Sequence, residues 1–304
     1  MRLLWKEVYE EYLIYVKYKL KPQTRRSLEE RFKTKINPYF KDFNIFDIKE
    51  IDYLKWQISI EEKNYSNNYK KNLHYLMSGF YEYLIKYHGV KKNIPKLVGN
   101  FKLKHEQNKY NTYNYKEFKK FIKCFENKIY KEFFNLMFFT GVRPGEAMAL
   151  KFSDLNKRIL SITKTIDEHG TRQVSDPKTI KSVRNIEIDR KLNRDLLKLK
   201  TIYLKKYKYF DDDFYIFGGI KPLAPTTINR YKISACKKCG LKPIKLHEFR
   251  HSHATMLLEK NLVINEISRR LGHSKTSITL DIYCHAKKEH EKKVIKTLNF
   301  IRLF

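Results

Sequence analysis

The spacing of apolar residues changes along this chain, and these changes limit the fold to two separate domains. Residues 1–100 place their apolar side chains at helical spacing, whereas parts of 158–189 alternate as strands do. Residues 101–111 are polar, basic and without a period, which is typical of a linker. The sequence therefore predicts a mainly α protein with a small antiparallel β-sheet. A helical domain occupies 1–100, and a mixed α/β domain follows the linker over 112–304.

Four helices are expected in the first domain. One begins at Trp5, a second covers residues 23–32, a third covers 54–61, and a long one with an apolar face covers 69–87. A plain helical bundle has the same pattern. A helical bundle as basic as this one, placed before a catalytic domain, could also bind one side of a DNA duplex.

In the second domain, Asn114 followed by Glu117 predicts a capping box at the start of a helix that ends near Gly141. Pro144 suits the first turn of the next short helix.

Short strands are then expected over residues 159–162, just before Asp176, and over 183–188. Because turn residues separate them, we expect an antiparallel sheet. After Gly219 the pattern is helical again to the end of the chain.

The formal net charge is +31, far more than solubility requires. The basic residues are spread over the whole length, so we expect both domains to contact a polyanion. A lysine-rich composition from an AT-rich genome is the alternative explanation. The four cysteines are too few for a disulfide framework, and a lone C-x-x-C is weak support for zinc. No apolar run approaches the roughly 18–20 residues that span a bilayer, so we expect a soluble protein in a reducing cytoplasm.

Five side chains, far apart in the sequence, combine into one chemistry: Arg143, His247, Arg250, His273 and Tyr283. Two guanidiniums can hold the oxygens of a phosphodiester while the phenol oxygen attacks its phosphorus. Charge in a phosphoryl transfer gathers on the non-bridging oxygens, so preorganised cations provide most of the catalysis. A tyrosine has a pKa of about 10, and nearby cations and a base would ease its deprotonation.

The local sequence around these residues favours a shared site. Arg143 opens a helix, where its guanidinium can point into a cleft, and Glu146 could orient it. His247 and Arg250 are spaced to share one face of a helix. His273 follows a glycine that ends a helix, which would place it in a loop. Each motif taken alone also fits a surface ion pair, a loop residue or a structural aromatic residue.

A competing pattern overlaps this stretch. His247, Glu248 and His251 match H-E-x-x-H, the helix of zinc metallopeptidases, with Glu259 or Glu266 as a third ligand. That hypothesis places an arginine beside a divalent cation and leaves the net charge unexplained. Loss of activity on chelation would separate the two alternatives.

Three motifs and one tyrosine carry a resemblance to a known family: Thr140-Gly141-x-Arg143-x-x-Glu146, His247-x-x-Arg250-His251-x-His253-Ala254, Leu271-Gly272-His273, and Tyr283. Their order and spacing resemble the tyrosine recombinase (phage integrase) family over about residues 112–290. The likeness is greatest to integrases of temperate phages and conjugative elements of low-GC Gram-positive bacteria. Residues 1–100 resemble that family's SAM-like, core-DNA-binding domain. The sequence starts at the first core-binding helix, so no arm-binding domain is expected within it.

The resemblance implies a role for each residue. Tyr283 would be the nucleophile that becomes joined to DNA through a 3′-phosphotyrosine, and Arg143 and Arg250 would clamp the scissile phosphate. His247 would take the tyrosine proton, and His273 would bond a non-bridging oxygen.

The family also uses a lysine in a β-hairpin as the general acid for the leaving 5′ oxygen. Lys178 is our choice because it lies in the turn before the 183–188 strand, and Lys181 is the runner-up.

The resemblance implies a site-specific DNA recombinase for integration or excision of a mobile element, without cofactor or metal. Its expected partners are duplex DNA recombination sites, three further copies in a homotetrameric synaptic complex, and DNA-bending or directionality accessory proteins, with no membrane. The expected location is the bacterial cytoplasm, at the nucleoid. The alternatives are a Xer-like dimer-resolving recombinase, a type IB topoisomerase-like enzyme, and a DNA-binding regulator that keeps the fold without the chemistry.

Overall fold

The computed structural model of the chain describes residues 2–102, 111–166, 174–175, 182–273 and 280. The chain divides into two compact units, Met1–Asn108 and Lys109–Phe304, and each unit has its own hydrophobic core. The boundary lies within the segment that the sequence predicts to be a linker. In the described ranges, none of the helices combines the length and the apolar composition that a bilayer span requires.

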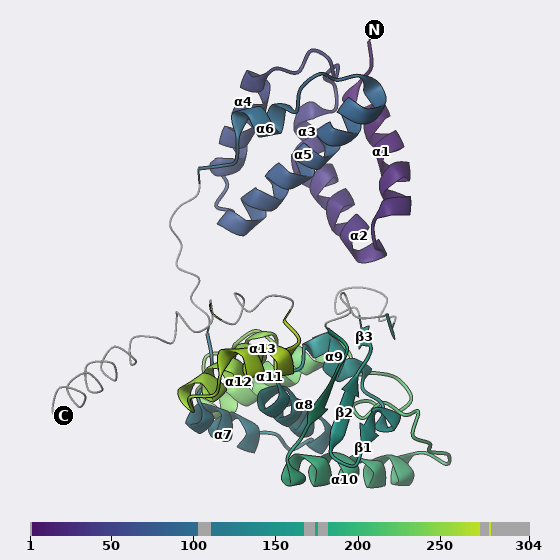
Figure 1. Ribbon diagram of the computed structural model, residues 1–304, viewed down its shortest axis with the longest axis vertical. Helices are drawn as coiled ribbons and strands as arrows, with labels where there is room; N and C mark the ends of the chain where they lie inside the picture. Colours follow the sequence, from purple (N-terminus) through teal and green to yellow (C-terminus); the bar gives the residue numbers. More distant parts are fainter. Residues whose placement is uncertain (1, 103–110, 167–173, 176–181, 274–279, 281–304) are drawn as a thin grey trace, which may run out of the picture. The chain divides into compact units, whose positions relative to one another are not determined.

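The N-terminal unit is helical (Figure 1). Its elements are α1 (Trp5–Lys19), α2 (Pro22–Arg31), the π-helical turn η1 (Phe32–Ile36), α3 (Asn37–Phe40), α4 (Glu50–Glu61), α5 (Asn67–His88) and α6 (Ile94–Val98). The four predicted helices are all present, and η1, α3 and α6 are additional. The helix predicted over 54–61 begins earlier, at Glu50, because the Asp52 carboxylate accepts the backbone N–H of Lys49 and caps the helix.

Aromatic side chains fill the core of this unit. Trp5 packs against Phe40 and Phe80, with ring centroids 4.9 Å and 4.6 Å apart. Its indole N–H donates to Asn37 across a distance of 3.0 Å, which satisfies the polar edge of a fully buried ring. The apolar faces predicted from the sequence therefore meet in one core.

The described part of the C-terminal unit contains seven α-helices. They are α7 (Tyr115–Lys123), α8 (Lys128–Thr140), α9 (Pro144–Ala149), α10 (Arg190–Lys206), α11 (Pro225–Cys239), α12 (Glu248–Glu259) and α13 (Ile264–Leu271), with a 3₁₀ turn, η2 (Phe152–Asp154). Helix α8 is central and packs on both α10 and α12 (Figure 1). The site described below lies at the C-terminal end of α8.

The sequence predicts one helix between Asn114 and Gly141, and this prediction is wrong because the structure has two helices there, α7 and α8. The predicted capping box is confirmed: Asn114 accepts the N–H of Glu117, and Glu117 accepts that of Asn114. The chain breaks after α7, and Asn127 caps α8 by accepting the N–H of Ile129 across 2.9 Å. This turn lets the phenylalanines of both helices face one core, where Phe118 and Phe138 stack with centroids 3.8 Å apart.

The strands of the described residues form two small antiparallel sheets. One has the order β1 (Leu155–Asn156), β2 (Ile159–Ile162), β5 (Arg184–Glu187), and the other pairs β3 (Thr165–Ile166) with β4 (Val174–Ser175). The three predicted strands are present as β2, β4 and β5, and their pairing is antiparallel as predicted. The single expected sheet is wrong, because β4 pairs with the unpredicted strand β3 in a second sheet instead of joining β2 and β5. Ile186 is buried, as the alternation predicts, and it faces Leu160 in the register of β2 and β5.

Candidate active site

Arg143 is positioned by the end of one helix and the start of the next. Gly141 ends α8 in the left-handed conformation (φ +68°), and Arg143 becomes the N-cap of α9. The Arg143 guanidinium contacts the carboxylate of Glu146 (Nη1–Oε1 2.7 Å) and donates from Nη2 to the carbonyl of Gly272 (3.2 Å). Its side chain is 33% exposed, so the guanidinium is held on its protein side and still reaches solvent.

Glu146 is the acceptor that orients Arg143, as the sequence suggested. Its side chain is only 2% exposed, and it also accepts the backbone N–H of Arg143 (2.9 Å). Burial alone would raise its pKa, but hydrogen bonds and charge from Arg184, together with the charge of Arg143, hold the pKa below its ordinary value. The carboxylate therefore stays ionised beside the two arginines.

Arg250 lies on α12 and is 1% exposed. Its Nη1 donates to the carbonyl of Gly141 (2.8 Å). Within the described part of the chain, its buried Nε and Nη2 have no hydrogen-bond partner. Burial and then the charge of Arg143 lower the pKa of this guanidinium well below its ordinary value. A buried cation with two unsatisfied donors is costly, and an oxyanion would remove that cost.

The two predicted histidines lie against these arginines. His247 precedes α12 and is exposed as a residue, yet protein atoms packed around its ring still disfavour the charged form. This desolvation, together with His251, Arg250 and Arg143, lowers the pKa of His247 to about 4. His273 directly follows Gly272, and burial with the charges of Arg250 and Arg143 lowers its pKa to about 3. Both rings are therefore neutral near pH 7.

Hydrogen bonds bring these groups together, although they come from α9, α12 and the turn after α13: Arg143 bonds the carbonyl of Gly272, next to His273, and Arg250, one helical turn from His247, bonds the carbonyl of Gly141. The structure thus brings together four of the side chains that the sequence singles out. The other candidates, Tyr283, Lys178 and Lys181, lie outside the described residues.

Glu248 has a structural position at the start of α12. Its carboxylate accepts the backbone N–H of Lys245 and that of Asn111. An acceptor already bound to two amides at a helix N-terminus is poorly placed to act as the base of a peptidase. Among the described residues, no group of three or more His, Cys, Asp or Glu side chains is placed to hold a metal ion.

Arg184 is a buried neighbour of the site that the sequence analysis missed. It lies on β5, its side chain is 7% exposed, and it bonds both oxygens of Glu146. The alternation of this strand places Arg184 on the same face as Ile186 and Ile188, which are buried. A charged residue on an otherwise apolar face was therefore the available signal.

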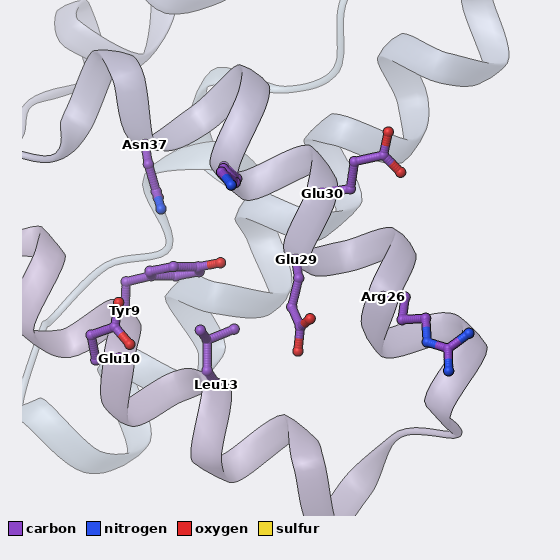
Figure 2. A pocket seen from close by; sticks show the side chains of 8 residues that line it. Tyr9, Glu10, Leu13, Arg26, Glu29, Glu30 and Asn37 are labelled. Carbon is purple, nitrogen blue, oxygen red and sulfur yellow. The ribbon is translucent and has the colours of Figure 1, made fainter. Parts of the chain in front are cut away.

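A separate groove of about 600 Å³ lies in the N-terminal unit (Figure 2). Tyr9 and Leu13 of α1 and Glu29 of α2 contribute to its lining, and its remaining charged groups are Glu10, Glu30, Arg26 and Lys33. The carboxylates outnumber the cations, so this groove is a poor match for a DNA phosphate. It shares no residue with the arginine–histidine cluster.

The sequence of residues 112–290, more than half of the chain, matches the phage integrase family. Residues 5–60 match the N-terminal SAM-like domain of phage integrases. The chain belongs to the phage integrase family. The predicted resemblance is therefore confirmed, and this integrase family member is a tyrosine recombinase rather than a metallopeptidase.

Curated relatives of this integrase family member come from mobile elements and from Xer-type recombinases. It is 29% identical over 286 residues to the ICEBs1 integrase of Bacillus subtilis, covering 87% of this chain and 74% of that protein. It is 30% identical over 214 residues to a XerC-like tyrosine recombinase of Caldanaerobacter subterraneus, covering 62% of this chain and 54% of that protein. The chain thus spans only about half of the second relative.

Solved structures show the same fold. The Tn1549 transposon integrase in complex with a circular intermediate DNA superposes with a TM-score of 0.76 at 17% identity, covering 97% of this chain and 99% of that one. A lambda integrase tetramer bound to a Holliday junction has a TM-score of 0.72 at 17% identity, covering 92% and 77%. The predicted fold class, a helical SAM-like domain followed by a mixed α/β recombinase domain, is confirmed.

Proposed function

We propose that this phage integrase family member is a site-specific DNA recombinase that cuts and rejoins duplex DNA during integration or excision of a mobile element. The observation that carries the proposal is the pair of arginines in one cluster, in which two buried donors of Arg250 have no acceptor among the residues that the structure describes. A scissile phosphodiester supplies oxygens that match those donors. The names of the relatives, which include integrases of mobile elements, agree with this activity.

The proposed cleavage is a transfer of the phosphoryl group to a side chain. The phenol oxygen of Tyr283 bonds to the phosphorus, the bond to the 5′ oxygen breaks, and a 3′-phosphotyrosine forms. Arg143 and Arg250 hold the non-bridging oxygens, where negative charge accumulates. The new ester keeps the energy of the broken linkage, so rejoining to another strand requires neither ATP nor metal.

Proton transfers complete the step. His247 accepts the phenol proton, and its lowered pKa, about 4, keeps it in the neutral, accepting form at neutral pH. His273 donates a hydrogen bond to a non-bridging oxygen. Lys178 gives a proton to the leaving 5′ oxygen, with Lys181 as the alternative donor. The reverse transfers accompany religation.

The proposed partners are duplex recombination sites and three further copies of the chain in a synaptic tetramer. The lambda integrase structure named above is a tetramer on a Holliday junction, and the same arrangement suits this fold. DNA-bending or directionality proteins are proposed as accessory partners, and the bacterial nucleoid as the location. The division into core-binding domain (1–100), linker (101–111) and catalytic domain (112–304) is part of the same proposal.

The decisive experiment uses a nicked suicide substrate, in which religation is prevented. The unaltered protein should form a covalent protein–DNA complex, and Tyr283→Phe should form none. A Phe variant that still cross-links would show that another residue is the nucleophile.

A chelator and a supercoiled plasmid test the remaining alternatives. Cleavage should persist in excess EDTA, whereas a metal-dependent hydrolase would lose its activity. Relaxation of the plasmid without strand exchange between two sites would favour a topoisomerase-like enzyme.

A further inference from the structure

Arg184 has more acceptors than a surface arginine normally finds. Its Nη1 and Nη2 donate to the two carboxylate oxygens of Glu146 (3.2 and 2.9 Å), Nη1 also donates to the carbonyl of Ser182 (2.9 Å), and Nε donates to that of Arg270 (2.9 Å). The side chain is 7% exposed. This planar, fork-like contact fixes the plane of the carboxylate, which a lysine at the same place could not do.

The same carboxylate holds the candidate phosphate ligand. Glu146 accepts both the guanidinium (2.7 Å) and the backbone N–H (2.9 Å) of Arg143. One buried carboxylate therefore lies between two guanidiniums, and the orientation of the first guanidinium limits the orientation of the second.

Both arginines also bond the end of α13, where helix carbonyls attract cations. Arg184 bonds the carbonyl of Arg270, and Arg143 bonds that of Gly272, the residue before His273. The contact thus joins β5, the start of α9 and the turn that carries a predicted catalytic histidine. A substitution at Arg184 would therefore affect Arg143, which is linked to it through Glu146, and the turn that carries His273, which follows the carbonyl that Arg184 bonds.

We propose that Arg184 is a positioning residue for DNA cleavage, which acts through Glu146 to hold Arg143 in the orientation that receives the scissile phosphate. This inference rests on the proposed recombinase activity. Arg184 itself does not need to touch DNA.

A double-mutant cycle tests the inference in the full-length protein, with single-turnover cleavage of the nicked substrate as the readout. Arg184→Lys keeps the buried charge but loses the fork. We expect about a 100-fold slower cleavage, the loss typical of a displacement of about 1 Å at a catalytic group. DNA affinity should change by no more than about threefold, because the many other phosphate contacts remain. In an Arg143→Lys background, the same change should cost less than about threefold, since the group it positions is already gone.

Arg158→Lys is the matched control. Arg158 belongs to the same sheet region and pairs with Glu187 (2.7 Å), but both side chains are exposed, so cleavage should remain unchanged. An equal loss from Arg184→Lys in both backgrounds, or loss of its cooperative unfolding transition, would assign Arg184 a purely structural role. No covalent complex with the unaltered protein would instead refute the proposed activity, so the two failures are distinguishable.

Discussion

At the scale of single residues, Gly141 links the fold to the candidate chemistry. It ends α8 with φ +68°, and its carbonyl accepts Nη1 of Arg250. A Cβ at this position would lie 2.5 Å from Leu271 and 2.7 Å from the ring of His253. Both the left-handed conformation and the close contact therefore require glycine.

Gly141→Ala should lower the free energy of unfolding by more than the backbone strain of an alanine in the left-handed conformation accounts for. Gly240→Ala is the control, since Gly240 caps α11 with φ +66° and has open space around it. The control should cost about 1–2 kcal/mol, and Gly141→Ala about 1–3 kcal/mol more, because neighbouring side chains must move. Urea unfolding of both variants measures the difference. Equal losses of stability in the two variants would mean that Leu271 and His253 move aside without destabilising the protein.

His253 predicts how stability depends on pH. It is 1% exposed, its Nδ1 lies 2.8 Å from the carbonyl of Phe138, and burial, together with Arg270, lowers its pKa to about 3 from 6.5. The unfolded histidine binds a proton below about pH 6.5 while the folded one stays neutral. The contribution of neutral His253 to the free energy of unfolding is therefore complete above pH 6.5. It falls as the pH drops towards 3, by up to about 1.4 kcal/mol per pH unit.

His253→Asn removes this titration and keeps an N–H for the Phe138 carbonyl. Its unfolding free energy, measured by urea titration between pH 7 and pH 5, should fall less steeply than that of the unaltered protein. His247 and His273 titrate in both proteins, so their effects cancel in the comparison. Parallel curves would contradict the assignment.

At the scale of elements, the N-terminus of α12 has a structural carboxylate next to predicted catalytic groups. Glu248→Gln keeps an acceptor but loses the charge that binds the amides of Lys245 and Asn111. We expect a loss of about 1–2 kcal/mol of stability, with cleavage of the nicked substrate within about threefold of the unaltered rate. Thermal unfolding and single-turnover cleavage measure both quantities. A complete loss of cleavage in a folded variant would show that the Glu248 carboxylate is needed for the reaction and not only for the start of α12.

Helical spacing and alternation predicted most elements correctly, since both depend on local backbone geometry. The break between α7 and α8 was missed because phenylalanines on both sides of it continue the apolar pattern. The short helices α3 and α6 were missed because one or two turns contain too few residues to show a period.

At the scale of the whole molecule, the two units have separate cores and the chain carries a net charge of +31. DNA affinity should therefore fall steeply with salt, with a log–log slope of about −0.9 for each phosphate neutralised. A titration of the full-length protein on a duplex between 50 and 300 mM salt, by fluorescence anisotropy, would measure the slope. A slope near zero would show that the charge of the chain is compositional rather than a DNA-binding feature.

The sequence by itself determined most helices and strands, because periodicity is a local property, and motif spacing singled out the residues of the candidate site. It also identified Arg143, His247, Arg250 and His273 before their positions were known. Only the tertiary structure showed that they converge, that two buried donors of Arg250 have no acceptor within the described part of the chain, and that Arg184 holds Glu146. Those facts depend on contacts between elements that are distant in the chain: α9 and α12 both pack on α8, α13 packs on α12, and Arg184 links β5 to Glu146 and to the end of α13.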